Sequence, residues 1–150
     1  MSTDWRKYLD FYEKVDVFGR RNGYQLEVNE PGDIVYTMKV MEEHQSSPNH
    51  CHGGVLAGLM DSTLGVSALS YAMTQKCLCS TVEFKINYLA PVHLGDELKA
   101  HGRIDHKGKS LVITSADIFE VSTGKLVCKG MGTFNLYPME KKDFIKDLLV

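Results

Sequence analysis

The sequence predicts an α+β fold in which a curved antiparallel sheet of five to six strands wraps around one long central helix. Between Gly54 and Met73, the only residue charged at neutral pH is Asp61. A helix that is apolar nearly all round must be covered on every side. Most of the remaining segments alternate apolar and polar residues between turn signals, which is typical of antiparallel strands. A sheet that curls around the helix is the economical way to bury it.

The N-terminal part predicts a helix followed by a hairpin. Residues 5–15 carry Trp5, Tyr8, Leu9 and Tyr12 at helical spacing, so we expect this amphipathic helix to cap the domain within a helical extension of residues 1–20. Residues 24–28 and 34–40 are predicted strands, and the proline and glycine between them suit a tight turn. The polar residues 42–51, which include Pro48, are predicted to form a loop.

The central helix is expected to begin near Gly53 because two glycines follow His52 there. After this helix, residues 81–88 alternate in strict period two, and Pro91 ends that strand. Three more strands are predicted at residues 97–105, 110–120 and 125–137, separated by turns at 107–109 and 122–124. A short tail, residues 139–150, closes the chain, and residues 142–150 of it are amphipathic.

Length and composition restrict the classes of protein to consider. A chain of 150 residues suits one domain spanning residues 1–150. Its 17 basic and 19 acidic residues are scattered, so we expect no nucleic acid as main partner. The four cysteines form no CxxC pair, and the N-terminus has no secretory apolar core, which favours the cytoplasm. Asp61 and several hydroxyl side chains argue against a membrane-spanning role for residues 55–73.

Asp61 and the start of the central helix are candidates for chemistry. A carboxylate isolated in a segment that otherwise favours burial costs free energy unless something pairs with it. Gly53 and Gly54 leave the helix N-terminus bare, and its unpaired N–H groups can hold the oxygen of a polarised carbonyl. The structural alternatives are a carboxylate paired with a hydroxyl or basic group, and a tight turn that needs glycine.

The motifs and their order resemble those of a known family. His52-Gly53-Gly54 is followed by Asp61, nine residues after the histidine, and three further motifs succeed one another: Asn87-Tyr88-Leu89-Ala90-Pro91, Gly108-Lys109-Ser110-Leu111 and Thr123-Gly124-Lys125-Leu126-Val127. Together these resemble the hotdog-fold acyl-CoA thioesterases, in particular the phenylacetyl-CoA thioesterase-like branch, over residues 23–136. The resemblance implies a hotdog fold and hydrolysis of an acyl-CoA to free acid and coenzyme A.

The resemblance also implies roles for single residues. The N–H of Gly53 would polarise the thioester carbonyl, and Asp61 would act as general base or nucleophile. Coenzyme A would enter as part of the substrate, and no further cofactor and no metal are expected. Eight residues of helix separate Gly53 from Asp61, roughly 12 Å, too far for both to act on one carbonyl. We therefore expect the site to be shared across a homodimer, itself paired into a dimer of dimers, as in this family.

Supporting residues are less sharply indicated. Where the branch commonly has an asparagine, this chain has Ser46, so Asn49 or His50 are the candidates for its role. Thr81 stands where a hydroxyl often supports the site. His52 could serve as a base, although a hydrogen bond that orients the loop is the favoured interpretation. The histidines and the cysteine of residues 44–52 have no closed four-ligand spacing for a metal.

Substrate-binding residues are predicted more broadly. Gly54 would stand near the bound ester, and Leu56 could line an acyl pocket or belong to the core. Lys107 and Lys109, with Lys85 and Arg103, could bind the phosphates of coenzyme A or form a solvated sheet face. Two other functions remain open: a non-catalytic acyl-CoA-binding module, and an enoyl-CoA hydratase on the same fold. The hydratase would need a histidine on the central helix, and that helix contains no histidine after His52.

Overall fold

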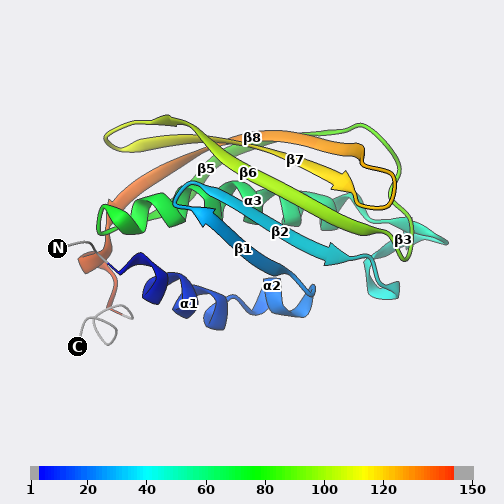
Figure 1. Cartoon of the computed structure of the whole chain (residues 1–150), viewed down its shortest axis with the longest axis horizontal. Helices are drawn as coiled ribbons and strands as arrows, with labels where there is room; N and C mark the ends of the chain where they lie inside the picture. Colours follow the sequence, from blue (N-terminus) through cyan, green and yellow to red (C-terminus); the bar gives the residue numbers. More distant parts are fainter. Residues whose placement is uncertain (1–3, 144–150) are drawn as a thin grey trace.

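A computed structural model describes residues 4–143 of the chain, so most of the predicted amphipathic tail lies outside the described residues. One long helix lies along the concave face of a curved sheet (Figure 1), which confirms the predicted α+β hotdog architecture. The elements are α1 (Trp5–Val15), α2 (Val17–Arg21), β1 (Gln25–Glu30), β2 (Asp33–Lys39), η1 (Glu42–His44), β3 (Gln45–Ser47), β4 (His50–Cys51), α3 (Gly53–Thr74), β5 (Cys77–Tyr88), β6 (Glu97–Lys107), β7 (Leu111–Glu120), β8 (Lys125–Pro138) and η2 (Met139–Lys141).

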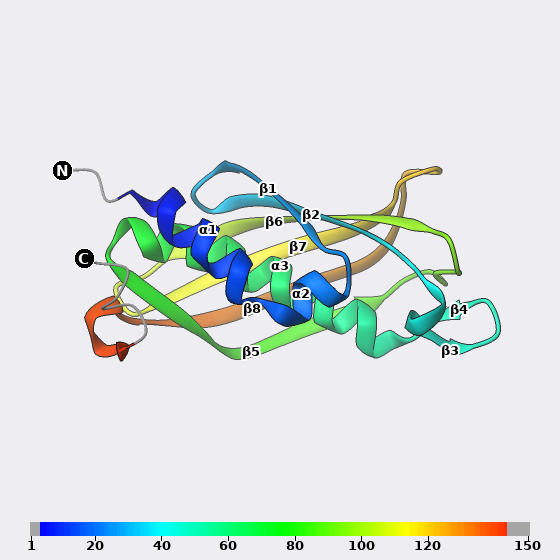
Figure 2. The same cartoon turned by 90° about the horizontal axis from the view of Figure 1, so that it is seen from below.

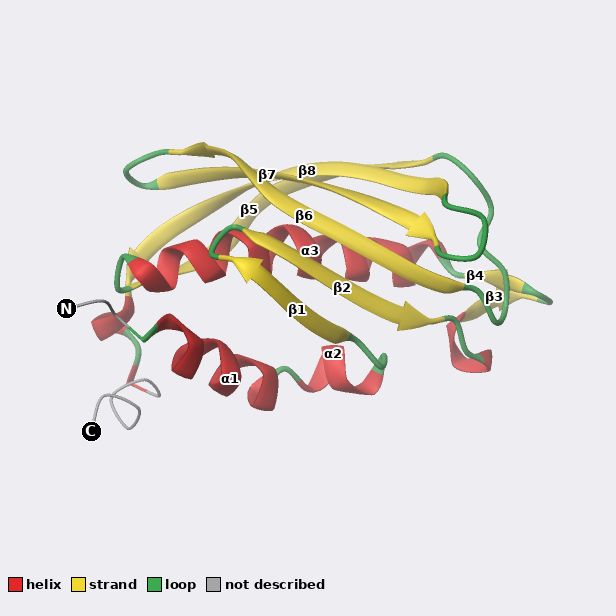
Figure 3. Cartoon of the chain, in the orientation of Figure 1, coloured by secondary structure: helices red, strands yellow, loops and turns green. Residues whose placement is uncertain are grey.

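The six long strands form one antiparallel sheet in the order β1-β2-β6-β7-β8-β5. The sheet therefore has β1 at one edge and β5, the strand that directly follows α3, at the other. Figure 3 shows the helices on one side of this sheet, with α3 between the strands and α1. The site residues expected on α3 and on β5 consequently lie at the same edge of the fold.

Helix α3 is buried because its side chains are apolar or small on nearly every face. Leu59, Met60 and Leu64 are fully buried against the sheet, and the polar Thr63 and Ser67 satisfy their hydroxyls on carbonyls of the same helix. By length and composition alone this helix could cross a membrane, but it forms the core of the structure, and 61% of its most apolar window is buried. The prediction of a buried helix is confirmed.

Three local features differ from the sequence prediction. Helix α2 was not expected; the carboxylate of Asp16, which ends α1, accepts from the N–H of Gly19 and so begins a second helix. The stretch 42–51, predicted as a loop, contains a 3-10 turn and the β3–β4 hairpin, which extends past the start of α3 (Figure 2). Strand β5 begins at Cys77 and has a bulge at Val82, so its period-two alternation is not strict.

Candidate functional site

The first turn of α3 presents one free backbone donor. His52 is the N-cap, and its Nδ1 accepts from the N–H of Gly54 at 2.7 Å. The N–H of Gly53 has no acceptor among residues 4–143. This N–H lies at the positive end of the 22-residue helix, where a developing negative charge is stabilised. The structure thus supports Gly53 as a donor to a substrate oxygen.

The same contacts bear on the predictions for His52 and Gly54. His52 orients the turn by its hydrogen bond, which confirms the favoured interpretation. The N–H of Gly54 already donates to His52, and contact between Gly54 and substrate stays a prediction. A side chain on Gly54 would lie 2.9 Å from Nδ1 of His52, so glycine is needed here for the imidazole to fold over the helix end.

Asp61 lies eight residues further along α3 and is half-buried. The hydroxyl of Thr81, on edge strand β5, donates to its Oδ1 at 3.1 Å. Within the described chain no basic side chain forms an ion pair with Asp61. Thr81, which was predicted to support the site, therefore contacts Asp61, and the other carboxylate oxygen accepts no hydrogen bond within residues 4–143.

A second residue of β5 marks the other end of the site. The hydroxyl of Tyr88 donates to the carbonyl of Gly53 at 2.9 Å, and its ring lies against the open side of that glycine. The sequence motif contained Tyr88, but no role was assigned to it. The bulge at Val82 explains this omission, because it puts Thr81 and Tyr88 on the same face although seven residues separate them.

The predicted residues of the β3–β4 hairpin lie apart from Asp61 along the fold. Asn49 forms the tip with a left-handed φ of 65°, and its N–H donates to the side chain of Gln45 at 2.8 Å. Ser46 is exposed on β3, and Nδ1 of His50 pairs with the carbonyl of Pro48. Because the hairpin projects beyond the first turn of α3 (Figure 2), these side chains do not meet Asp61 of the same chain.

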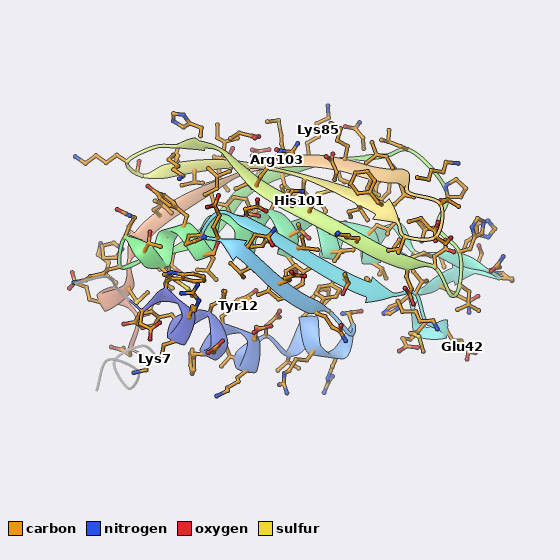
Figure 4. The ribbon with its side chains drawn as sticks, viewed as in Figure 1. Lys7, Tyr12, Glu42, Lys85, His101 and Arg103 are labelled. Atoms are coloured by element: carbon orange, nitrogen blue, oxygen red, sulfur yellow. The ribbon has the colours of Figure 1, made fainter. Side chains whose placement is uncertain are left out.

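The predicted basic residues are not gathered at this site within one chain. Lys107 stacks on Tyr71, with Nζ 4.8 Å from the ring centroid, and Tyr71 lies ten residues beyond Asp61, roughly 15 Å along α3. Lys109 is exposed in the following turn. Lys85 and Arg103 lie on the outer face of the sheet (Figure 4), where they help to line a cleft of about 340 Å³. Contact of these residues with the phosphates of coenzyme A stays a prediction.

The remaining predictions concern the core and the thiols. Leu56 is 4% exposed and belongs to the core, so it can only line a buried pocket. Burial, with the nearby carboxylate of Asp61, raises the pKa of the Cys79 thiol to about 12, and burial raises that of Cys51 to about 11. Both thiols stay protonated at neutral pH and are poor nucleophiles. Between residues 4 and 143, no group of three or more possible ligands is arranged to hold a metal ion.

Two tyrosines from the N-terminal part of the chain pack against the core. Tyr12 extends from α1 toward α3 (Figure 4), and Tyr24 precedes β1. Burial raises the pKa of both phenols, and the charges of Asp16 and Asp61 contribute to the rise. The apolar spacing of residues 5–12 predicted the cap, but no local signal showed that Phe18 and Tyr24 lie against the turn at Gly58.

Comparison with known proteins places the chain in a family. Residues 48–127 match the family described as the thioesterase superfamily, and this range includes Gly53, Asp61 and Thr81. Human acyl-coenzyme A thioesterase 13 is 33% identical over 107 residues, which cover 71% of this chain and 74% of the human protein.

Solved structures agree with the fold. The PaaI protein of Escherichia coli, from the phenylacetic acid degradation operon, superposes with a TM-score of 0.80 at 24% identity, over 89% of this chain and 92% of that chain. A hypothetical thioesterase of Streptococcus pneumoniae, solved with coenzyme A, superposes with a TM-score of 0.70 at 29% identity, over 77% and 86% of the two chains. The first likeness concerns the fold alone.

Proposed function

Because this chain belongs to the thioesterase superfamily, we propose that it hydrolyses the thioester bond of an acyl-CoA to the free acid and coenzyme A. The observation that supports this most directly is the pairing of Thr81 with Asp61. This carboxylate has no cationic partner within residues 4–143 and lies on a helix whose first N–H is free. A base and an oxyanion donor are the groups that thioester hydrolysis requires.

In the proposed reaction the carbonyl oxygen of the ester accepts from the N–H of Gly53. The hydroxyl of Thr81 holds Oδ1 of Asp61, so the second carboxylate oxygen faces a water molecule. The water oxygen attacks the carbonyl carbon as Asp61 takes its proton, and the tetrahedral oxyanion forms at the helix N-terminus. The C–S bond then breaks, and the thiolate of coenzyme A takes the proton from Asp61, which returns the carboxylate to its starting state. Direct attack by the carboxylate is the alternative, with an anhydride that water then cleaves.

We infer that the two groups come from different chains. Gly53 and Asp61 lie eight residues apart on one helix, roughly 12 Å along its axis. Edge strand β5 pairs with β8 on one side only, so its other side has backbone groups that a second copy can pair with. Thr81 and Tyr88 on this strand contact Asp61 and Gly53 respectively. Antiparallel pairing of two β5 strands brings Thr81 of one chain toward Tyr88 of its partner, and so Asp61 toward the partner's Gly53.

This arrangement predicts the position of the two-fold axis. The midpoint between Thr81 and Tyr88 lies at Phe84 and Lys85, and Lys85 is exposed. Directly opposed residues of antiparallel strands have Cα atoms about 4.5–5.5 Å apart, which suits a disulfide. In this register Lys85 lies opposite the partner's Phe84, so the double variant Phe84→Cys/Lys85→Cys is expected to form a covalent dimer on mild oxidation, whereas the control Lys99→Cys, exposed on β6, stays monomeric on a denaturing gel. Equal cross-linking of both variants would contradict this register.

The activity itself is tested by release of free thiol from a panel of acyl-CoA esters. The native protein and Asp61→Asn are compared at equal oligomeric state; the amide keeps the acceptor for Thr81 but cannot take a proton. Turnover that falls by orders of magnitude in the variant supports the mechanism. Binding of coenzyme A esters without thiol release would indicate a binding module. Loss of a conjugated double bond without thiol release would indicate a hydratase.

A further inference from the structure

The hydroxyl of Tyr24 is a buried polar group that the proposed hydrolysis does not use. In the described part of the chain, it is the single buried side-chain polar atom without a hydrogen-bond partner. A buried hydroxyl without a partner loses its hydration without compensation, which proteins avoid unless the group has another use. Its location indicates what that use is.

The hydroxyl points at α3 between the two groups of the proposed site. A side chain on Gly58 would lie 3.5 Å from this oxygen and 2.8 Å from the ring of Phe18. Gly58 follows Gly54 by one helical turn and precedes Asp61 by three residues. Tyr24 therefore faces the stretch of helix that separates the oxyanion donor from the carboxylate on the same chain.

The surroundings of this hydroxyl are aromatic. The ring of Phe18 meets that of Tyr24 edge-on with centroids 5.9 Å apart, and Tyr36 lies 5.5 Å away on the other side. Phe18 is 53% exposed, so the outer side of this aromatic wall faces solvent. An apolar wall with one polar group is the usual construction of a site that binds an organic group in a fixed orientation.

The backbone holds Tyr24 in this position. Its N–H donates to the carbonyl of Gly19 at 2.9 Å, and Gly23 takes a left-handed φ of 72° to turn the chain from α2 toward β1. Helix α2 thus fixes the phenol against α3.

We propose that Tyr24 determines acyl specificity, its hydroxyl donating a hydrogen bond to a neutral oxygen on the acyl group of the substrate. This inference rests on the proposed thioesterase function. Burial, with the nearby charges of Asp16 and Asp61, raises the pKa of Tyr24, so the phenol keeps its proton. The same two carboxylates disfavour a negatively charged acyl group. The acyl class is therefore one with a hydroxyl, keto or ether oxygen.

The test compares esters that differ by one oxygen. Hexanoyl-CoA is measured beside its five hydroxyhexanoyl-CoA isomers, and phenylacetyl-CoA beside its ring-hydroxylated isomers, so that aliphatic and aromatic sources are separated. For the native protein, at least one hydroxylated ester is expected to have a kcat/KM about tenfold higher than that of its parent ester. This is the effect of one buried hydrogen bond between neutral groups. Tyr24→Phe is expected to remove this preference while it still hydrolyses the parent ester.

A matched control and a second readout separate this inference from the hydrolysis itself. Tyr137→Phe removes a phenol hydroxyl on β8, where Tyr137 pairs with Leu78 near the start of β5, and is expected to keep the preference. Dissociation constants of the same esters, measured with Asp61→Asn and with Asp61→Asn/Tyr24→Phe, report specificity without turnover. If the native protein releases thiol from none of the esters, the proposed function is refuted, but the dissociation constants still test the role of Tyr24. A preference that is absent in native protein, or unchanged in Tyr24→Phe, overturns the role of Tyr24.

Discussion

Replacing Gly53 with proline is expected to abolish most activity while leaving the fold intact. Proline lacks the N–H and is tolerated at the first position of a helix, which is where Gly53 lies. The preceding residue, His52, has φ −64° and ψ 133°, within the region that proline requires of its predecessor. The N–H that is lost has no acceptor among residues 4–143. A Cβ at this position meets Tyr88 at 3.6 Å, an ordinary contact.

The size of the effect follows from the role of the donor. Loss of one oxyanion donor costs about 10²–10³ in kcat, or about 2.7–4 kcal/mol. In proline the ring carbon Cδ replaces the amide hydrogen. The kcat therefore falls only if the reacting carbonyl oxygen binds at the nitrogen of residue 53. The free energy of unfolding is expected to stay the same or rise by about 0.4–1 kcal/mol, because proline restricts the unfolded chain.

The assay is thiol release from the best acyl-CoA ester, together with the midpoint of urea unfolding. Gly53→Ala is the matched control, since it adds the same Cβ but keeps the N–H, and its kcat is expected near the native value. A folded Gly53→Pro protein with native kcat would refute the assignment of Gly53 as oxyanion donor. An equal loss in Gly53→Ala would attribute the effect to the added side chain instead.

Three further changes have distinct expected results. Thr81→Val removes the hydrogen bond to Asp61 and is expected to lower kcat about five- to tenfold at unchanged melting temperature, with Thr81→Ser restoring it; no loss of kcat would contradict the positioning role. Hydrogen bonds from the side chain of Thr123 and then from Ser122 lower the pKa of Glu120 to about 2 from an ordinary 4.5. Its stabilisation is therefore complete above about pH 4.5 and lost as pH falls toward 2, so the melting temperature of Glu120→Gln should lie below native at pH 6 and converge with it at pH 2; a constant gap would contradict this. Gly102→Ala is expected to destabilise by about 1–3 kcal/mol in urea unfolding, because its Cβ would lie 2.8 Å from the carbonyl oxygen of Thr63, and a native midpoint would show that α3 shifts freely.

The elements that local pattern determines were predicted well. Helix α1 has the predicted bounds, and α3 begins at Gly53 as expected, because apolar periodicity and the bare glycines are local signals. Helix α2 was missed because five residues are too short for periodicity, although Asp16 and Gly19 have the spacing of an N-cap contact. The β3–β4 hairpin depends on contacts between distant groups, such as the N–H of His52 with the carbonyl of His44, which no local pattern indicates.

The candidate site divides in the same way. Gly53 and Asp61 could be identified because a lone carboxylate and a bare helix end are unusual in an apolar segment. The contacts of Tyr88 with Gly53 and of Tyr24 with the turn at Gly58 could not be predicted, because they join segments that are thirty or more residues apart in the sequence and meet only in the folded chain. For the basic residues two interpretations stayed open, because sequence gives charge but not the face of the sheet on which it lies.

The central claim is that each site combines Gly53 of one chain with Asp61 of its partner. Gly53→Pro and Asp61→Asn proteins are each expected to be nearly inactive, and they can be mixed, unfolded together and refolded. Random reassociation makes half of the dimers mixed, and in a mixed dimer one of two sites has both intact groups. Thiol release should then recover to about one quarter of the native rate. A mixture that stays as inactive as its two components, although mixed dimers have formed, would show that both groups act within one chain.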